Sequence, residues 1–135
     1  MFVVDASVAL AWCFADETSE LADRVLDTLE HDDALAPAIW PLEVANGLRS
    51  AERRGRLDLA DLPRVRELLT SLPVQIEAVT LDTALGEVTE LARQLELTAY
   101  DAAYLSLAAR RGLALATIDD RLRRACEQAG VELLA

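Results

Sequence analysis

The sequence contains no lysine, and all thirteen of its basic residues are arginine. There are 24 acidic residues, so the formal net charge is −11. Proteins that bind nucleic acid normally contact phosphates through an excess of Lys and Arg, so this balance argues against a broad basic surface. Arginine is concentrated in residues 49–56 and 110–124, where a local basic surface could form. Cations at the ends of solvated helices would explain both clusters equally well.

Histidine and cysteine are almost absent. The single histidine, His31, argues against a His-rich zinc site and against a Ser-His-Asp triad. The two cysteines, Cys13 and Cys126, are far apart and have no Cys-x-x-Cys spacing. We expect them to pack as small apolar residues in a reducing compartment, and nothing supports a disulfide between them.

Long hydrophobic runs are also missing. No segment approaches the roughly 20 apolar residues needed to span a bilayer. Residues 1–14 are apolar, but they lack a basic start, and Asp5 interrupts the run before it reaches the length of a signal peptide. We therefore expect a cytoplasmic protein. With 135 residues, 53% of them apolar, and no linker or repeat, the sequence predicts one globular domain over residues 1–135.

Short apolar runs alternate with amphipathic segments along the chain. The runs predict strands at 2–5, 34–36, 74–79, 113–117 and 131–134. The amphipathic segments predict helices at 6–14, 20–31, 40–54, 58–72, 81–95, 98–112 and 119–129. This alternation is typical of an α/β fold, with a mostly parallel sheet that helices cover on both faces.

Four acidic residues lie in unusually apolar surroundings. Asp5 is the only charged side chain in the first fifteen residues, and it stands at the end of a predicted strand. Asp119 follows another predicted strand, so we expect both at the edge formed by the carboxyl ends of the strands. Asp101 is the only charge in residues 97–109, and Glu43 has no arginine within one helical turn. A hard divalent cation such as Mg²⁺ or Mn²⁺, which prefers oxygen ligands, would neutralise this set directly.

Each acid also has a structural explanation. Asp5 and Asp119 could cap the helices that follow them, and Asp101 has the spacing of a capping box with Thr98. Glu43 could be an ordinary exposed helix residue. These alternatives stay open at the level of the sequence.

Four short motifs, taken in order, resemble those of PIN-domain ribonucleases, specifically VapC-type toxins of type II toxin–antitoxin modules. They cover the chain from end to end and comprise Val3–Ser7, Pro41–Asn46, Thr98–Tyr104 and Leu115–Leu122. The resemblance implies a three-layer α/β/α sandwich with a central parallel sheet. It also implies an endoribonuclease that depends on Mg²⁺ or Mn²⁺ and uses three or four acids.

Carried over to this chain, the resemblance implies that Asp5 and Asp101 bind the metal directly. Asp119 would bind it directly or through water, and Glu43 would bind through water or orient the nucleophile. Asp120 lies beside the matching position, but the Thr-x-Asp spacing favours Asp119.

The resemblance further implies that two hydroxyl residues, Ser7 and Thr117, hydrogen-bond to the metal-binding acids. It implies a cognate antitoxin that covers the site, a homodimer, and structured cytoplasmic RNAs such as tRNA or rRNA as targets. RNA substrates of this kind would require more basic residues than this chain has. The low basic content argues against tight substrate binding, and it does not argue against the fold.

Two other functions are alternatives. Phosphoaspartate proteins, such as receiver domains and haloacid-dehalogenase-type phosphatases, use an acid pair near the first strand and a lysine near the last. Here Ser7 occupies the second position of the Asp-x-Asp pair and lysine is absent, so this class is disfavoured. The second alternative is a catalytically inactive PIN-like protein-interaction module in which the acids serve as caps.

Overall fold

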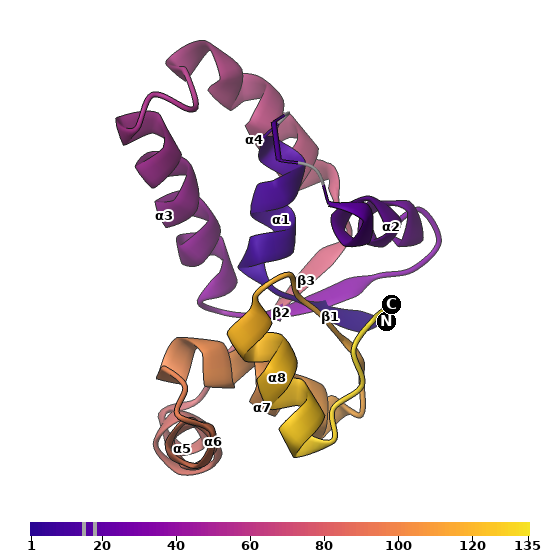
Figure 1. Cartoon of the computed structure of the whole chain (residues 1–135), viewed down its shortest axis with the longest axis vertical. Helices are drawn as coiled ribbons and strands as arrows, with labels where there is room; N and C mark the ends of the chain where they lie inside the picture. The colour runs from indigo at the N-terminus through magenta and orange to yellow at the C-terminus, as the bar shows by residue number, and fades with distance from the viewer. Residues whose placement is uncertain (15, 18) are drawn as a thin grey trace.

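The computed structural model describes residues 1–14, 16–17 and 19–135, and a parallel β-sheet lies at its centre (Figure 1). The sheet has the strand order β3-β2-β1-β4, and each neighbouring pair is parallel. The strands are β1 (Phe2–Val4), β2 (Ala34–Pro37), β3 (Val74–Glu77) and β4 (Leu115–Ala116). The predicted α/β class with a parallel sheet is therefore confirmed.

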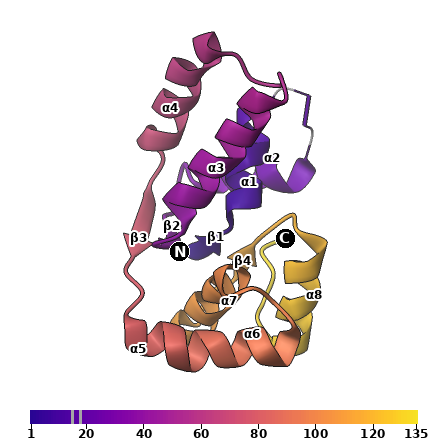
Figure 2. The same cartoon turned by 90° about the vertical axis from the view of Figure 1, so that its left-hand side faces the viewer.

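Helices cover both faces of the sheet, so the predicted three-layer sandwich is confirmed as well. Figures 1 and 2 show α1–α4 on one side of the strands and α5–α8 on the other. The first group comprises α1 (Ala6–Cys13), α2 (Glu20–Thr28), α3 (Trp40–Arg53) and α4 (Leu62–Ser71). The second comprises α5 (Leu81–Thr83), α6 (Thr89–Leu95), α7 (Ala99–Arg111) and α8 (Asp120–Ala129).

Helix α7 packs against β1 and β2. Every residue from Ala102 to Ala108 is buried, which explains why this stretch contains only small, apolar and uncharged side chains. Thr98 accepts a hydrogen bond from the Asp101 backbone N–H at its start, and Gly112 ends it with a φ of 64°. Both ends of the helix lie where the sequence placed them, and Asp101 falls in the first turn.

The strand predicted at residues 131–134 is reduced to a single parallel bridge between Leu115 and Leu133. The Leu115 backbone N–H donates to the Glu132 carbonyl, and the Leu134 N–H donates to the Leu115 carbonyl. The predicted fifth strand is therefore wrong in extent. Strand β4 is only two residues long, so it offers too short a ladder for a full neighbour.

The helix predicted at residues 81–95 is interrupted by a π-helical turn at Ala84–Val88, between α5 and α6. The Thr89 hydroxyl donates a 2.6 Å hydrogen bond to the Ala84 carbonyl. A π turn holds more residues than an α turn, so it rotates the side chains that precede it relative to those that follow. As a result Leu85, expected on the apolar face, is 68% exposed, while Val88 is buried.

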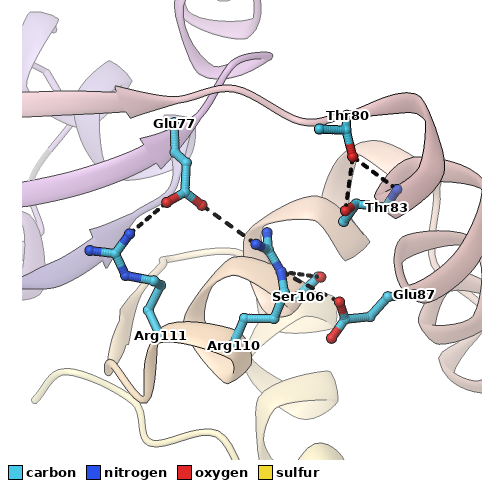
Figure 3. Close-up of polar contacts among 7 residues, drawn as sticks. All are labelled: Glu77, Thr80, Thr83, Glu87, Ser106, Arg110 and Arg111. Carbon is cyan, nitrogen blue, oxygen red and sulfur yellow. Dashed lines mark hydrogen bonds and ion pairs between the residues drawn. The ribbon is translucent and has the colours of Figure 1, made fainter.

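Two arginines at the end of α7 are joined to acids on neighbouring elements (Figure 3). Arg111 lies 2.6 Å from Glu77 at the end of β3. Arg110 lies 3.6 Å from Glu77, 3.5 Å from Glu87 in the π turn, and donates to the Ser106 hydroxyl on its own helix. These pairs neutralise two of the five arginines in residues 110–124, so they weaken the case for a basic surface there.

The cysteines behave as the sequence predicted. Cys13 and Cys126 are both buried with free thiols. Burial raises the pKa of each thiol to about 11, which favours the unreactive protonated form. In the part of the chain that the structure describes, no helix has the length and apolar character to cross a membrane.

Candidate metal centre

Four secondary-structure elements bring the predicted acids to one edge of the sheet. Asp5 follows β1 and stands at the N-cap position of α1, and Asp119 follows β4 and caps α8. Glu43 lies in the first turn of α3, and Asp101 lies in the first turn of α7. Strands β1 and β4 are parallel neighbours, so their carboxyl ends share an edge, as expected. The charge of Asp119 raises the pKa of Asp5 and Asp101, and the charges of Asp5 and Asp101 raise the pKa of Glu43.

Asp5 is the central acid of this group. Its side chain is 94% buried, and its Oδ2 accepts hydrogen bonds from the Ser7 hydroxyl at 2.7 Å and the Thr117 hydroxyl at 2.8 Å. Burial raises the pKa of Asp5, the two hydrogen bonds oppose that rise, and the charge of Asp119 adds to it. No basic side chain among the described residues forms an ion pair with Asp5.

The hydroxyls of Ser7 and Thr117 are held in place by backbone N–H groups of the segment that follows β4. Ser7 Oγ accepts from the Ile118 N–H at 3.1 Å, and Thr117 Oγ1 accepts from the Asp119 N–H at 3.1 Å. Each hydroxyl therefore receives a backbone hydrogen and directs its own hydrogen at Asp5. This arrangement orients the carboxylate and leaves Oδ1 without a side-chain donor in the described part of the chain. The predicted roles of Ser7 and Thr117 as hydrogen-bond partners agree with these contacts.

Glu43 is held by a residue that the sequence did not single out. The Tyr104 hydroxyl donates to Glu43 Oε1 at 2.5 Å, and the Tyr104 side chain is completely buried. Burial raises the pKa of Glu43, the charges of Asp5 and Asp101 raise it further, and the Tyr104 hydrogen bond opposes them. Burial and the neighbouring Glu43 also raise the pKa of Tyr104, which keeps its hydroxyl protonated. The sequence feature that could have pointed to Tyr104 is its spacing from Asp101. A residue three positions after Asp101 lies on the same face of the helix.

Asp101 is partly buried at the N-terminus of α7. Burial raises its pKa, and the charges of Asp5 and Asp119 raise it further. The positive charge of Arg121 opposes this rise. The carboxyl is thus destabilised as an anion by its surroundings, although it lies at a helix end that favours negative charge.

Asp119 and Asp120 are separated by the start of α8. Asp119 Oδ1 accepts from the Leu122 N–H at 3.0 Å, so the structural interpretation of Asp119 as an N-cap is confirmed. Its charge still acts on Asp5 and Asp101. Asp120 lies in a different surface hollow, which Arg24 and Arg123 also line. The geometry therefore favours Asp119 over Asp120 as the fourth acid.

The chemistry of this donor set suits a hard divalent cation. All four groups are carboxylates, and the pKa values of Asp5, Glu43 and Asp101 are raised by burial and by mutual repulsion. A bound cation would offset both effects. The described residues contain no group of three or more acids already close enough to enclose an ion. An ion here would therefore use waters to complete its shell, which is the usual habit of Mg²⁺.

Comparison with known proteins identifies the family. Residues 2–128 match the PIN domain. The chain belongs to the PIN domain family. It is 33% identical over 120 residues to Ribonuclease VapC3 of Pyrobaculum aerophilum, an alignment that covers 89% of this chain and 90% of that relative.

Solved structures share the fold of this PIN domain. PAE2754 from Pyrobaculum aerophilum has a TM-score of 0.69 and 28% identity, and the match covers 92% of this chain and 83% of that one. A toxin–antitoxin complex from Klebsiella pneumoniae has a TM-score of 0.62 and 17% identity, with 88% and 87% coverage. The resemblance inferred from the four motifs is therefore confirmed.

Proposed function

We propose that this PIN domain, spanning residues 1–135, is a Mg²⁺- or Mn²⁺-dependent endoribonuclease and the toxin of a toxin–antitoxin module. The observation that carries the proposal is the environment of Asp5. It is buried, receives two oriented hydroxyl hydrogen bonds, and has three further acids around it instead of a basic partner. A buried carboxylate is costly unless something compensates its charge, and a divalent cation does so. The ribonuclease named among the relatives supports the same activity.

In this proposal Asp5 and Asp101 would hold the ion, and Asp119 would bind it directly or through water. When bound, such an ion polarises a phosphoryl oxygen and lowers the pKa of a coordinated water. Glu43 orients the attacking water or accepts its proton, for which a raised pKa is suitable. Ser7 and Thr117 keep Asp5 in one orientation, and Tyr104 does the same for Glu43.

A cognate antitoxin is the proposed protein partner. A groove of about 810 Å³ between α3 and α4 has mainly apolar walls, including Trp40, Val44 and Leu48 of α3 and Leu62 and Leu69 of α4. A peptide segment with apolar side chains would suit this groove. The similar fold found in a toxin–antitoxin complex supports such a partner.

We further propose a homodimer that acts on structured cytoplasmic RNAs such as tRNA or rRNA. Leu42 and Tyr100 are 66% and 59% exposed, and they line a shallow hollow beside Glu43 together with Ile39. A second copy that covered these side chains would remove apolar surface from water.

The test is cleavage of total RNA by the purified chain with and without Mg²⁺ or Mn²⁺. Asp5→Asn should abolish cleavage while the protein stays folded, and Asp120→Asn is the matched control because it removes a neighbouring acid outside the cluster. Metal-dependent cleavage that Asp5→Asn retains would contradict the proposal. A wild-type chain that binds partners but cuts no RNA would favour the inactive interaction module.

A further inference from the structure

A surface cleft leads away from the acids between α1 and α3. Its volume is about 360 Å³. Ser7 and Asp119 lie on its wall at the metal-centre end, and Arg54 and Arg56 lie on it at the far end of α3. The cleft therefore joins the candidate metal centre to a part of the surface where two arginines and one acid, Glu17, lie together.

Small residues on α3 keep this cleft open. The cleft wall on α3 includes Gly47, Ser50 and Ala51, whereas α1 contributes Leu10 and Phe14. Gly47 also lets the two helices approach closely, since a Cβ at this position would lie 2.5 Å from Leu10 Cδ1. The result is an open cleft with an apolar wall on one side and a partly polar wall on the other.

Of the two arginines at the far end, Arg54 is the one whose charge is available. Arg56 lies 3.4 Å from Asp16 and 3.7 Å from Glu17, and its guanidinium stacks 4.7 Å from the centre of the Phe14 ring. Arg54 is exposed and forms no ion pair with any residue that the structure describes. An unpaired arginine in a cleft that leads to carboxylates is well placed to bind a phosphate group.

Arg54 lies far along α3 from Glu43, so it would not contact the phosphate held beside Glu43. It follows Glu43 by eleven positions along α3, which corresponds to about 16 Å of helix. It would instead meet another phosphate of the same strand. The cleft volume of about 360 Å³ is at the lower end of the range of small-molecule pockets, about 300–1,000 Å³, and suits a short single-stranded segment.

We propose that the cleft between α1 and α3 binds the single-stranded RNA segment that flanks the scissile bond, with Arg54 contacting a backbone phosphate there. This inference rests on the proposed ribonuclease function. It also accounts for the acidic composition, because one local contact beside the site replaces a broad basic surface.

The test measures RNA binding instead of cleavage. The Asp5→Asn chain, which is inactive under the proposed function, is titrated against a fluorescein-labelled 12-nucleotide single-stranded RNA of mixed sequence at several salt concentrations. Arg54→Ala in this background should weaken binding several-fold and reduce the slope of log K against log salt by about 0.7, the value for one phosphate contact on a single strand. Arg53→Ala is the matched control, because Arg53 is exposed, unpaired in the described chain and outside the cleft.

A second variant tests whether the RNA occupies the cleft. Ser50→Trp fills the cleft and should weaken binding of the 12-nucleotide RNA without changing the net charge. Equal binding by the Arg54→Ala and Arg53→Ala variants would overturn the proposal, and an acidic segment of a protein partner would then become the candidate occupant. Because cleavage by the wild-type chain is measured separately, cleavage without Arg54-dependent binding would overturn this inference alone.

Discussion

The hydroxyl of Tyr104 and the carboxylate of Glu43 connect two layers of the protein through one hydrogen bond of 2.5 Å. Tyr104 lies on α7 and Glu43 on α3, and these helices cover opposite faces of the sheet (Figure 1). This hydrogen bond lies at the edge of the sheet where Asp5 follows β1. The position of Glu43 relative to Asp5 therefore depends on Tyr104, a buried residue of the opposite helical layer.

The first prediction is that Tyr104→Phe lowers kcat about tenfold or more and changes KM little. Loss of an outer hydrogen-bond partner typically costs 10- to 100-fold in such sites. Because the hydrogen bond lowers the pKa of Glu43, its removal should move the acidic limb of the pH–rate profile to higher pH. Thr89→Val is the control, since it removes a hydroxyl hydrogen bond to the Ala84 carbonyl outside the acid cluster. An unchanged acidic limb would show that Tyr104 acts only on stability.

The second prediction concerns the hydroxyl of Thr117, which is completely buried. Thr117→Val removes both the donor to Asp5 and the acceptor for the Asp119 N–H, so Mn²⁺ affinity should fall about tenfold and unfolding free energy by about 1–3 kcal/mol. Thr117→Ser keeps the hydroxyl and should preserve the affinity. Calorimetric titration with Mn²⁺ measures the effect. Equal affinities for the Val and Ser variants would contradict a role for the hydroxyl.

The third prediction is that Mn²⁺ raises the midpoint of thermal unfolding through the acid cluster. An ion at about 100 times its Kd stabilises by about 2.7 kcal/mol, which corresponds to several degrees in a domain of this size. Asp5→Asn and Asp101→Asn should lose the shift, whereas Asp120→Asn should keep it. Equal shifts in all four proteins would mean that the ion only screens the negative surface.

The fourth prediction concerns pH in the absence of metal. The pKa values of Asp5, Glu43 and Asp101 are raised in the folded protein, mainly by burial, so the folded state binds protons more tightly than the unfolded chain. The stability that these groups contribute is therefore lost as pH rises from the unfolded values, about 4, through the raised folded values. Urea unfolding of the metal-free protein should show a steeper decline with pH for the wild type than for Asp101→Asn. Parallel declines would contradict the raised pKa of Asp101.

Mn²⁺ should reverse this trend. The ion requires deprotonated carboxylates, so its stabilising effect should grow as pH rises through the same range. The difference between unfolding curves with and without Mn²⁺, measured at several pH values, tests this point. A stabilisation by Mn²⁺ that did not change with pH would place the ion on groups that are already ionised.

The sequence predicted correctly those helices and strands whose ends are marked by a capping residue, a glycine or a lone charge. Thr98 and Gly112 bound α7 as expected, because a cap hydrogen bond and a left-handed glycine are local effects. The position of Asp5 followed equally well, since a lone charge after a buried strand must lie at the strand end. Local signals of this kind do not depend on the rest of the fold.

Other features depend on contacts between distant segments. The apolar run at residues 131–134 resembles a strand, but the shortness of β4 limits its pairing to one bridge. The spacing of Leu85 from Val88 fits the apolar face of a regular α-helix. No feature of the sequence predicts the π turn that exposes Leu85. Tyr104 is a core residue, and its bond to Glu43 depends on the relative positions of α3 and α7.

The hydrogen bond between Asp5 and Thr117 joins residues 112 positions apart, so it also sets when the acid cluster can form during synthesis. Domains generally fold from the N-terminal side as the chain is made. A growing chain that stops before β4 already contains Asp5, Glu43 and Asp101, but it lacks Asp119 and the hydroxyl that orients Asp5. We therefore expect chains that stop before β4 to lack the complete acid cluster and to be inert toward RNA.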